Sequence, residues 1–393
     1  MRTKLLTAAI GAAITAMALP AHAEFALGDE TKGIKVKFSD EADMNVRVRL
    51  QPRVDFGDLV RNGTTGQFES ESDLYLRRAR LEVDGKLTKA LSYNLTLSAD
   101  RSSQASRTAS GAGGVDFDIL FAYLDYKFAD PFSLRFGESK LPLSRVSLSS
   151  SSKQLLVERP ASSEAAKSFF GDYEQANLQA YGKLAEGVFN YYFAIGDGTA
   201  APASGTATVA TGVESDTAFI GRVEFSPPGW VEKGKSDAHL GKDKHLAFGL
   251  HAGQQNALKS LTAATETDRS LLGGDVSFHL GGFTAQVEYN AWKTETTGAA
   301  DVEPKGWYAQ LGYFIPGANI EPAVRYEVFD RNSNATTDRE DKITTAGLNW
   351  YFKGHSMKLG INWVRTEFGS GNLTGTSPDD KQNVYQVQTQ VYF

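Results

Sequence analysis

The sequence predicts an all-β chain that closes into a transmembrane antiparallel β-barrel of about 16 strands, with one long loop folded into the lumen. Three observations predict this fold: polar and apolar residues alternate in many short segments, tight and long links alternate between them, and the chain ends in an aromatic-rich strand. The composition agrees, since 38 Gly, 15 Tyr and 23 Phe accompany only 12 Pro in 393 residues. Such a composition suits many strands with aromatic anchors better than a helical protein.

The strands are predicted from period-two alternation. The segment LSYNLTLSAD, residues 91–100, places an apolar side chain at every second position and a polar one between. In a strand these two sets lie on opposite faces, so one face can meet lipid and the other a polar lumen. The same pattern predicts strands at residues 44–56, 73–87, 91–100, 117–128, 131–137, 173–184, 188–196, 217–226, 244–254, 270–280, 283–293, 305–315, 319–330, 341–353, 356–367 and 383–393.

The links between these segments distinguish a membrane barrel from a sandwich, which would also alternate. Short links alternate with links of about 10 to 35 residues rich in Ser, Thr, Gly and Asp. An even number of strands joined in this way is typical of outer-membrane barrels, whose two ends lie on the periplasmic side. One link departs from the rule, because residues 227–243 are long where a short turn is expected.

The two ends of the chain support export to an outer membrane. The last strand places Tyr385, Val391 and Phe393 on the face that would meet lipid, and such a C-terminal Phe resembles the sorting signal of bacterial outer-membrane barrels. At the other end, two cations precede an apolar run over residues 5–19 and a small-residue site, which predicts a signal peptide over residues 1–23. That run is shorter than the roughly 20 residues of a membrane-spanning helix.

We therefore expect three parts: a cleaved signal peptide (1–23), a short N-terminal periplasmic segment (24–43) and a barrel domain (44–393). The chain has no cysteine, which excludes a disulfide-stapled scaffold and thiolate metal sites. A P-loop, a dinucleotide fingerprint, a zinc pattern and a basic nucleic-acid patch are not found, so we expect no cofactor, no metal and no nucleic-acid partner.

Arginines crowd the inward face of the first two strands. A charged side chain on the lipid face costs roughly 2–4 kcal/mol at the bilayer midplane, so the apolar residues must face out and the charged ones in. The inward phase then takes Arg47, Arg49 and Arg53 in residues 44–56, Arg78 and Arg80 in residues 73–87, and Arg135 in residues 131–137.

Two residues do not fit this phase. Arg77 falls on the lipid phase near the external end of its strand, where we expect it to reach the membrane interface with its long side chain. Pro52 donates no hydrogen bond to the ladder, so it predicts a bulge or a missing bond in residues 44–56.

The link after residues 131–137 is the second candidate site. Some 35 residues without a strand are too long for a passive connector. Folded into the lumen, the link would present ammonium, guanidinium and hydroxyl donors to a passing anion. The candidate donors are Lys140, Arg145, Ser147, Ser149, Ser150, Ser151, Ser152 and Lys153.

A plainer interpretation exists for both sites. The arginines could pair with inward carboxylates and keep the wall polar, above all Arg222 and Arg325, which have Glu224 and Glu327 two residues on. The Ser-rich link could be a flexible external loop.

At this point the sequence resembles the phosphate-selective porin O and P family over residues 44–393. The resemblance lies in LRRARLEVDGKL (76–87), LRFGESKLPLSR (134–145), KQLLVERP (153–160), GRVEFSP (221–227) and GLNWYF (347–352). It implies a 16-stranded, usually trimeric barrel with a ladder of inward cations and a selective loop inside. Arg78 and Arg80 would then belong to the ladder. The constriction would be lined by Lys140, Arg145, Ser147, Ser149, Ser150, Ser151, Ser152 and Lys153.

The leading hypothesis is an outer-membrane porin in contact with lipid and lipopolysaccharide, assembled as a homotrimer and passing small anionic solutes such as phosphate. A barrel with a structural or partner-sheathing role is the alternative. A barrel hydrolase is a further one, and it would need a His beside a Ser or a carboxylate. The candidate histidines lie in no recognisable motif; they are His239, His245, His251, His279 and His355.

Overall fold

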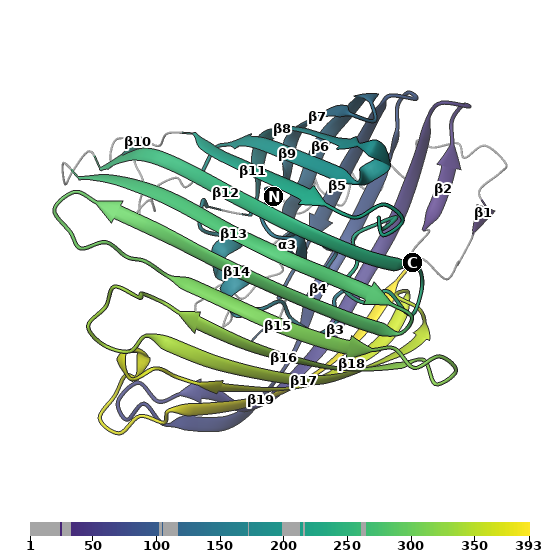
Figure 1. Ribbon diagram of the computed structural model, residues 1–393. Coiled ribbons are helices and arrows are strands. Elements are labelled where there is room, and N and C mark those ends of the chain that lie inside the picture. Colours follow the sequence, from purple (N-terminus) through teal and green to yellow (C-terminus); the bar gives the residue numbers. More distant parts are fainter. Residues whose placement is uncertain are drawn as a thin grey trace, which may run out of the picture.

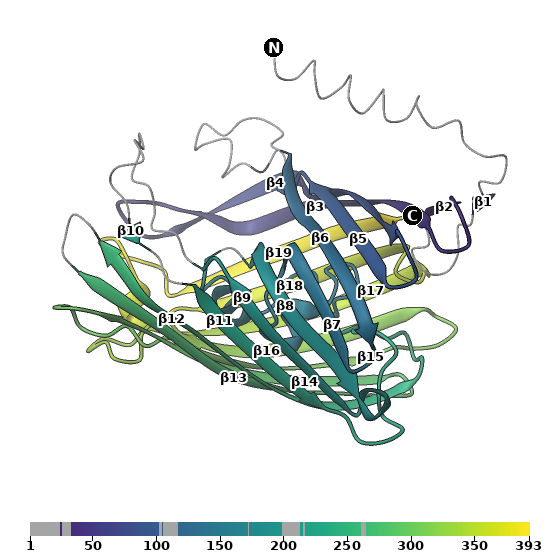
Figure 2. The same ribbon diagram turned by 90° about the horizontal axis from the view of Figure 1, so that it is seen from above.

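The computed structural model describes residues 24–25, 33–101, 104, 117–171, 173–198, 213–214, 217–260 and 265–393, so the predicted signal peptide over residues 1–23 lies outside the described residues. Sixteen long strands of this described part form the barrel (Figures 1 and 2). They are β3 (Asp43–Arg61), β4 (Phe68–Lys86), β5 (Leu91–Ser98), β6 (Asp118–Ala129), β7 (Phe132–Lys140), β8 (Glu174–Leu184), β9 (Phe189–Gly196), β11 (Ala218–Phe225), β12 (Lys244–Ser260), β13 (Glu266–Leu280), β14 (Phe283–Thr296), β15 (Lys305–Tyr313), β16 (Ile320–Asp330), β17 (Glu340–Lys353), β18 (Met357–Glu367) and β19 (Lys381–Tyr392).

Each barrel strand pairs antiparallel with the next, β9 pairs with β11, and β19 pairs with β3 to close the ring. Closure satisfies every backbone ladder and leaves no open sheet edge in lipid. Three short strands lie beside the barrel: β1 (Glu24–Phe25), β2 (Ile34–Lys37) and β10 (Val213–Glu214). β2 forms a hairpin with the start of β3, so part of the segment over residues 24–43 extends the sheet. The predicted 16-stranded barrel is confirmed, and each predicted strand is found.

The two faces of the wall differ as the alternation predicts. The outer face carries exposed apolar side chains such as Leu74, Phe136, Leu250 and Leu272. The inner face carries buried polar side chains, among them Gln179. No helix of the described residues is long and apolar enough to cross a membrane.

The short links, such as residues 281–282, and Phe393 lie at one end of the barrel, which we call the turn end (Figure 1). Long links such as residues 331–339 and 368–380 lie at the opposite end, which we call the loop end.

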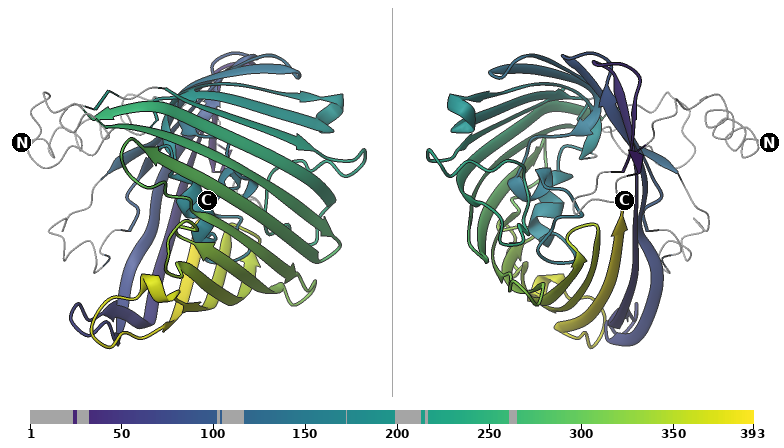
Figure 3. Two further views of the ribbon diagram at one scale, coloured as in Figure 1. Left: turned by 60° about the vertical axis from the view of Figure 1, so that its left-hand side comes forward. Right: turned by 90° about the vertical axis from the view of Figure 1, so that its right-hand side faces the viewer.

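The link between β7 and β8 lies inside the barrel, as predicted. This segment, residues 141–173, is called the inner loop below. It contains two short helices, α3 (Arg145–Leu148) and α4 (Ala161–Lys167), which Figure 3 shows within the ring of strands. Its apolar side chains pack against one side of the wall in two clusters. Phe170 packs near Ile220 and Trp292, and Leu155 packs near Phe314. The inner loop therefore packs against the part of the wall between β11 and β18.

Inward-facing glycines make room for this loop. A Cβ atom on Gly306 would lie 2.4 Å from the Cβ of Ser162, and one on Gly312 would lie 2.6 Å from Cδ1 of Leu155. Gly347 and Gly360 face Leu156 and Val157 in the same way, and Gly253 faces Phe170. Contacts this short are incompatible with a larger side chain unless the loop moves. The wall is thus shaped to fit the loop at these positions.

The irregular link over residues 227–243 also enters the barrel, from the turn end. The backbone N–H groups of Asp237 and Ala238 donate to the carbonyl of Lys153, at 3.2 and 2.9 Å. Ala238 is fully buried. The length of this link allows it to reach the inner loop from the turn end and to form hydrogen bonds with it.

Candidate functional site

One open space of the lumen lies between the inner loop and the wall formed by β3 to β8. It is a cavity of about 590 Å³. Of the described residues that line it, eleven are cations: Arg47, Arg49, Arg77, Arg78, Arg80, Arg101, Arg135, Lys140, Lys153, Arg159 and Lys167. Four are acids: Glu82, Asp100, Glu164 and Glu174. A confined space with this excess of cations focuses a positive potential that attracts anions.

A second cavity, of about 760 Å³, continues from the first toward the turn end. The two share Arg47, Asn94, Tyr123 and Arg135 in their linings. The second cavity reaches Asp43, at the beginning of β3. Together the two cavities form one passage along the β3 to β7 side of the barrel.

Five of the six predicted inward arginines line this passage, namely Arg47, Arg49, Arg78, Arg80 and Arg135, and acids of the wall pair with most of them. Arg53 is buried and is not among the lining residues of either cavity, which corrects the expectation for it. Arg49 lies 2.5 Å from Glu82 and donates to the hydroxyl of Ser151 at 2.8 Å. Arg47 pairs with Asp84 on the neighbouring strand. Further along the wall, Arg80 and Arg135 pair with Asp100 and Asp125, at 2.5 and 2.7 Å.

The prediction for Arg77 is wrong, because its side chain lies inside the barrel. The pairing of β3 with β4 shifts register at Pro52: Gln51 lies opposite Arg78, but Pro52 lies opposite Leu76. Arg77 is the extra residue of this bulge, which Pro52 had predicted. The bulge lets Arg77 and Arg78 point to the same side, and both are buried.

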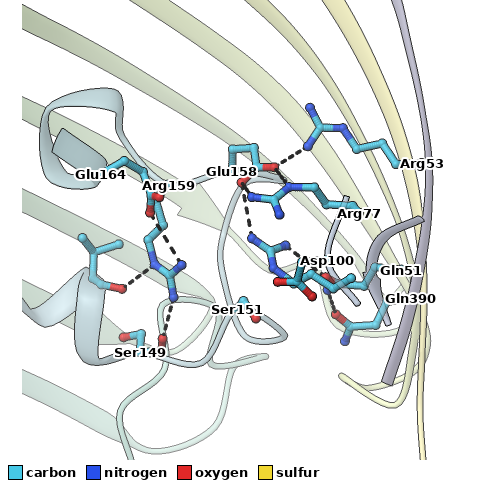
Figure 4. A network of polar contacts seen from close by, with 12 residues as sticks. Gln51, Arg53, Arg77, Asp100, Ser149, Ser151, Glu158, Arg159, Glu164 and Gln390 are labelled. Atoms are coloured by element: carbon cyan, nitrogen blue, oxygen red, sulfur yellow. Dashed lines mark hydrogen bonds and ion pairs between the residues drawn. The ribbon is translucent and has the colours of Figure 1, made fainter. Parts of the chain in front are cut away.

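Three arginines meet one carboxylate of the inner loop (Figure 4). Glu158 accepts hydrogen bonds from Arg53 and from Arg77, the latter to both carboxylate oxygens. The guanidinium of Arg78 lies 3.4 Å from the same carboxylate and donates to Gln51 at 3.0 Å. Burial alone would raise the pKa of Glu158, but the three guanidinium groups outweigh it and hold that pKa well below its ordinary value. The carboxylate is therefore ionised.

Three predicted site residues of the inner loop also lie elsewhere, which corrects the expectation that they face the passage. Arg145 points to the far side of the inner loop and forms two hydrogen bonds with Glu232, at 2.5 and 2.7 Å. Ser147 and Ser149 are fully buried, and Ser149 contacts Asp237 at 3.0 Å. Burial raises the pKa of Glu232, yet Arg145 outweighs this and lowers it to about 2. Arg145 and Ser149 thus attach the loop to the link over residues 227–243, whereas Ser147 forms hydrogen bonds with Ser144 inside the loop.

The other predicted loop residues do reach the passage: Lys140, Ser150, Ser151, Ser152 and Lys153. The ammonium of Lys140 donates to the carbonyls of Ser147 and Ser149, at 3.1 and 3.2 Å. Among the described residues, the structure shows no hydrogen-bond acceptor or ion-pair partner for the ammonium of Lys153. Lys153 therefore offers free donors to a passing solute.

The inner loop covers a row of acids on the opposite wall. Asp275, Glu288 and Glu327 lie in register across β13, β14 and β16. The loop donates to all three: the backbone N–H of Arg145 to Asp275 at 3.3 Å, Ser163 to Glu288 at 2.6 Å, and the backbone N–H of Ser162 to Glu327 at 2.7 Å. The loop thus hides these acids from the passage, which leaves the cations of the other wall dominant.

The plainer interpretation, in which an arginine only pairs with a carboxylate of the wall, applies to Arg222 but not to Arg325. Arg222 is fully buried and pairs with Asp275 and Glu224, at 2.6 and 3.0 Å. Arg325 instead donates to the backbone carbonyls of Glu158 and Arg159, at 2.9 and 3.4 Å. Arg325 therefore positions the loop.

Sequence reasoning missed Arg77 and Arg159 as residues that line the passage, and Glu158 as the carboxylate that pairs with its arginines. The bulge at Pro52 could have indicated Arg77, since one extra residue reverses the phase of its neighbours. Glu158 carried no such signal, because its place depends on how the loop folds. The inward-phase glycines, such as Gly306 and Gly312, could have indicated which wall the loop contacts.

Among the described histidines, His245 contacts a serine hydroxyl, but its surroundings are not those of a catalytic triad. His245 lies 2.7 Å from the hydroxyl of Ser277, but both side chains are buried and the other ring nitrogen faces the carbonyl of Trp230. A catalytic triad needs a carboxylate at that nitrogen and an exposed hydroxyl. In the part of the chain that the structure describes, no group of three or more His, Asp and Glu side chains is arranged to hold a metal.

The chain matches the family described as phosphate-selective porin O and P over residues 46–393. It is 36% identical over 389 residues to an uncharacterized protein of Aquifex aeolicus, covering 93% of this chain and 91% of the other. It is 24% identical over 213 residues to Porin O of Pseudomonas aeruginosa, covering 45% of this chain and 46% of the other.

Solved structures share the fold at low sequence identity. The anion-selective porin from Comamonas acidovorans superposes with a TM-score of 0.62 at 14% identity, covering 90% of this chain and 100% of that one. The trimer form of OmpT of Vibrio cholerae gives 0.60 at 10% identity, covering 90% and 100%. The outer-membrane channel DcaP of Acinetobacter baumannii gives 0.59 at 12% identity, covering 91% and 99%.

Proposed function

Because this chain belongs to the phosphate-selective porin O and P family, we propose that it forms a water-filled channel in the outer membrane of a Gram-negative bacterium, through which small anions diffuse passively. The observation that carries the anion preference is the charge of the passage: thirteen residues that line its two cavities are cations and seven are acids. A cationic passage raises the local concentration of anions and lowers the cost of removing part of their water shell.

The inner loop creates this bias by its position. It covers Asp275, Glu288 and Glu327 on one wall and leaves Arg47, Arg49 and the other cations open on the opposite wall. An anion would pass along the open wall, with Lys153 as the contact whose donors are free. Conduction also needs weak binding, since a solute that is held tightly does not leave.

We propose selection by charge rather than recognition of phosphate as such. Most guanidinium groups of the passage already have a carboxylate partner, as Arg80 has Asp100 and Arg135 has Asp125. A fork of free donors that matches phosphate would need such groups unpaired. The anion selectivity named for the Comamonas neighbour agrees with this charge preference.

The route is tested by labelling introduced cysteines, because the natural chain has none. Asn94 lies where the two cavities meet, whereas Thr345 is fully buried on the opposite wall. In Asn94→Cys, a sulfonate-bearing thiol reagent should reduce the current and should be favoured over a cationic reagent, relative to the rates with a small free thiol. Thr345→Cys, the matched control, should stay unmodified.

Modification of Thr345→Cys with loss of current, or a preference of Asn94→Cys for the cationic reagent, would contradict the proposed route and its sign. Neither the hydrolase nor the partner-sheathing alternative is supported by an observation of comparable weight.

We propose a homotrimer embedded in lipid and lipopolysaccharide. The support is a broad exposed apolar face, with Phe136, Leu250 and Leu272 among its side chains, and a neighbour whose described form is a trimer. The native mass of the detergent-solubilised protein checks this, since a monomeric mass would contradict it.

We also propose that residues 1–23 are removed on export and that residues 24–43 stay on the periplasmic side. The cations and the apolar run of the first residues support cleavage. N-terminal sequencing of protein from outer membranes should begin near Glu24, and an intact Met1 would contradict the proposal.

A further inference from the structure

Glu158 differs from the other acids that pair with the arginines of the passage. Asp84, Asp100 and Asp125 each lie on the β3 to β8 side of the barrel, beside the arginine they pair with. Glu158 comes from the inner loop and crosses the lumen to reach Arg53, Arg77 and Arg78. Glu158 is thus a carboxylate that the inner loop places among the arginines of the opposite wall.

The geometry around this carboxylate is that of a bound anion. Four guanidinium nitrogens from three arginines point at its two oxygens. Arg325 holds the backbone carbonyl of the same residue at 2.9 Å, which fixes the carboxylate in place. About a quarter of the Glu158 side chain, 26%, is still exposed. Arg77 and Arg78 line the passage, and the Glu158 carboxylate occupies their guanidinium donors.

Removing this charge would leave the arginines poorly compensated. Asp55 pairs with Arg53, at 2.6 Å, but the structure shows no other carboxylate within ion-pair distance of Arg77 among the described residues. Buried cations without a partner are costly. They would therefore recruit a mobile anion, with the planar forks that carboxylate and phosphate oxygens match.

We propose that Glu158 is a tethered anion that occupies an oxyanion site made by Arg53, Arg77 and Arg78, and so prevents permeating anions from being trapped there. This inference rests on the proposed function, which it deepens. The arginines still supply the positive potential of the passage, but their strongest donors are already used. Anions then pass without a tight stop, and the site would accept phosphate or a carboxylate once Glu158 is neutral.

The test is block of the chloride current by inorganic phosphate in single channels. In the wild-type protein, conductance should rise in proportion to KCl concentration and phosphate should compete weakly. In Glu158→Gln, conductance should saturate at low KCl, and the half-blocking phosphate concentration should fall at least about tenfold, which corresponds to about 1.4 kcal/mol.

Glu164→Gln is the matched control. Glu164 lies on the same loop, lines the first cavity and pairs with Lys167 at 3.0 Å. Its replacement by Gln removes one negative charge, as Glu158→Gln does, but leaves Glu158 bound to the arginines. The half-blocking concentration of Glu164→Gln should fall by much less than that of Glu158→Gln, because Glu164 lines the cavity but does not occupy the arginine site. An equal fall in both variants would mean that a general change of potential, and not the site, is responsible, and it would overturn the proposal.

Folding is checked by the heat-modifiable mobility of the barrel. Should Glu158→Gln fail to fold, Glu158→Asp keeps the charge but withdraws it from the guanidinium groups, and an intermediate half-blocking concentration is expected. A half-blocking concentration equal to the wild-type one, in whichever variant folds, contradicts the proposal. A wild-type channel whose conductance saturates at low KCl, and whose current is blocked by a low concentration of phosphate, also contradicts the proposal. A cation-selective wild-type channel would instead contradict the proposed function. The ratio of half-blocking phosphate concentrations between the variants could still be measured, so the two failures are distinguishable.

Discussion

A channel carrying Gly312→Leu and Gly347→Leu is expected to conduct more current than the wild-type protein, with higher noise and open levels above the wild-type level. Both glycines face the inner loop, and a Cβ atom at either would lie 2.6 Å from a leucine of that loop. Overpacking costs about 1–3 kcal/mol per site. The strands are held by their backbone hydrogen bonds, so we expect the inner loop to move rather than the wall. A cost of this size shifts the equilibrium between the packed and the displaced loop by about 5- to 150-fold.

The control for this variant is Gly221→Leu. Gly221 has no atom within 4 Å of its would-be Cβ, so the same change adds volume without touching the loop. Its conductance should equal that of the wild type. A double variant that conducts no more than this control would show that the loop does not set the width of the passage.

The second large effect is expected from Arg78→Gln with Arg80→Gln, which should reduce the anion preference. Both residues line the passage. A unit charge about 6 Å from an ion in a water-like medium contributes roughly threefold to its local concentration, so the loss of two should lower the permeability ratio by about tenfold. Permeability ratios from reversal potentials check this, with heat-modifiable mobility as evidence that the barrel still folds.

The matched control is Lys293→Gln, which removes a cation from β14 outside the set that lines the passage. It should leave the permeability ratio unchanged. An unchanged ratio in the double arginine variant would mean that Arg78 and Arg80 only keep the wall polar.

Much of the barrel follows from the sequence because its rules are local. Lipid exposure forces apolar side chains to every second position, so the pattern of residues 91–100 predicts a strand without any knowledge of its neighbours. The same rule predicts the inward phase of Arg49 and Arg78. It fails at Arg77, because the bulge depends on Pro52 of the paired strand.

The inner loop is harder to predict because its contacts are distant in sequence. Its length indicates that it folds inward, and the structure places it there. Which of its residues face the passage depends on the surfaces it meets. Arg145 turns away because Glu232 lies in the link over residues 227–243, and Glu158 reaches the opposite wall because Arg325 holds its backbone. No local pattern in residues 141–173 contains this information.

The central claim is that the passage prefers anions, and the reversal potential of the wild-type channel in a salt gradient tests it most directly. The measurement uses the purified protein in a planar bilayer with KCl at two concentrations. A reversal potential of the sign and size of an anion-selective pore is the expected result, since thirteen cations and seven acids line the two cavities of the passage. A reversal potential of the opposite sign, in a channel that otherwise conducts normally, would contradict the account.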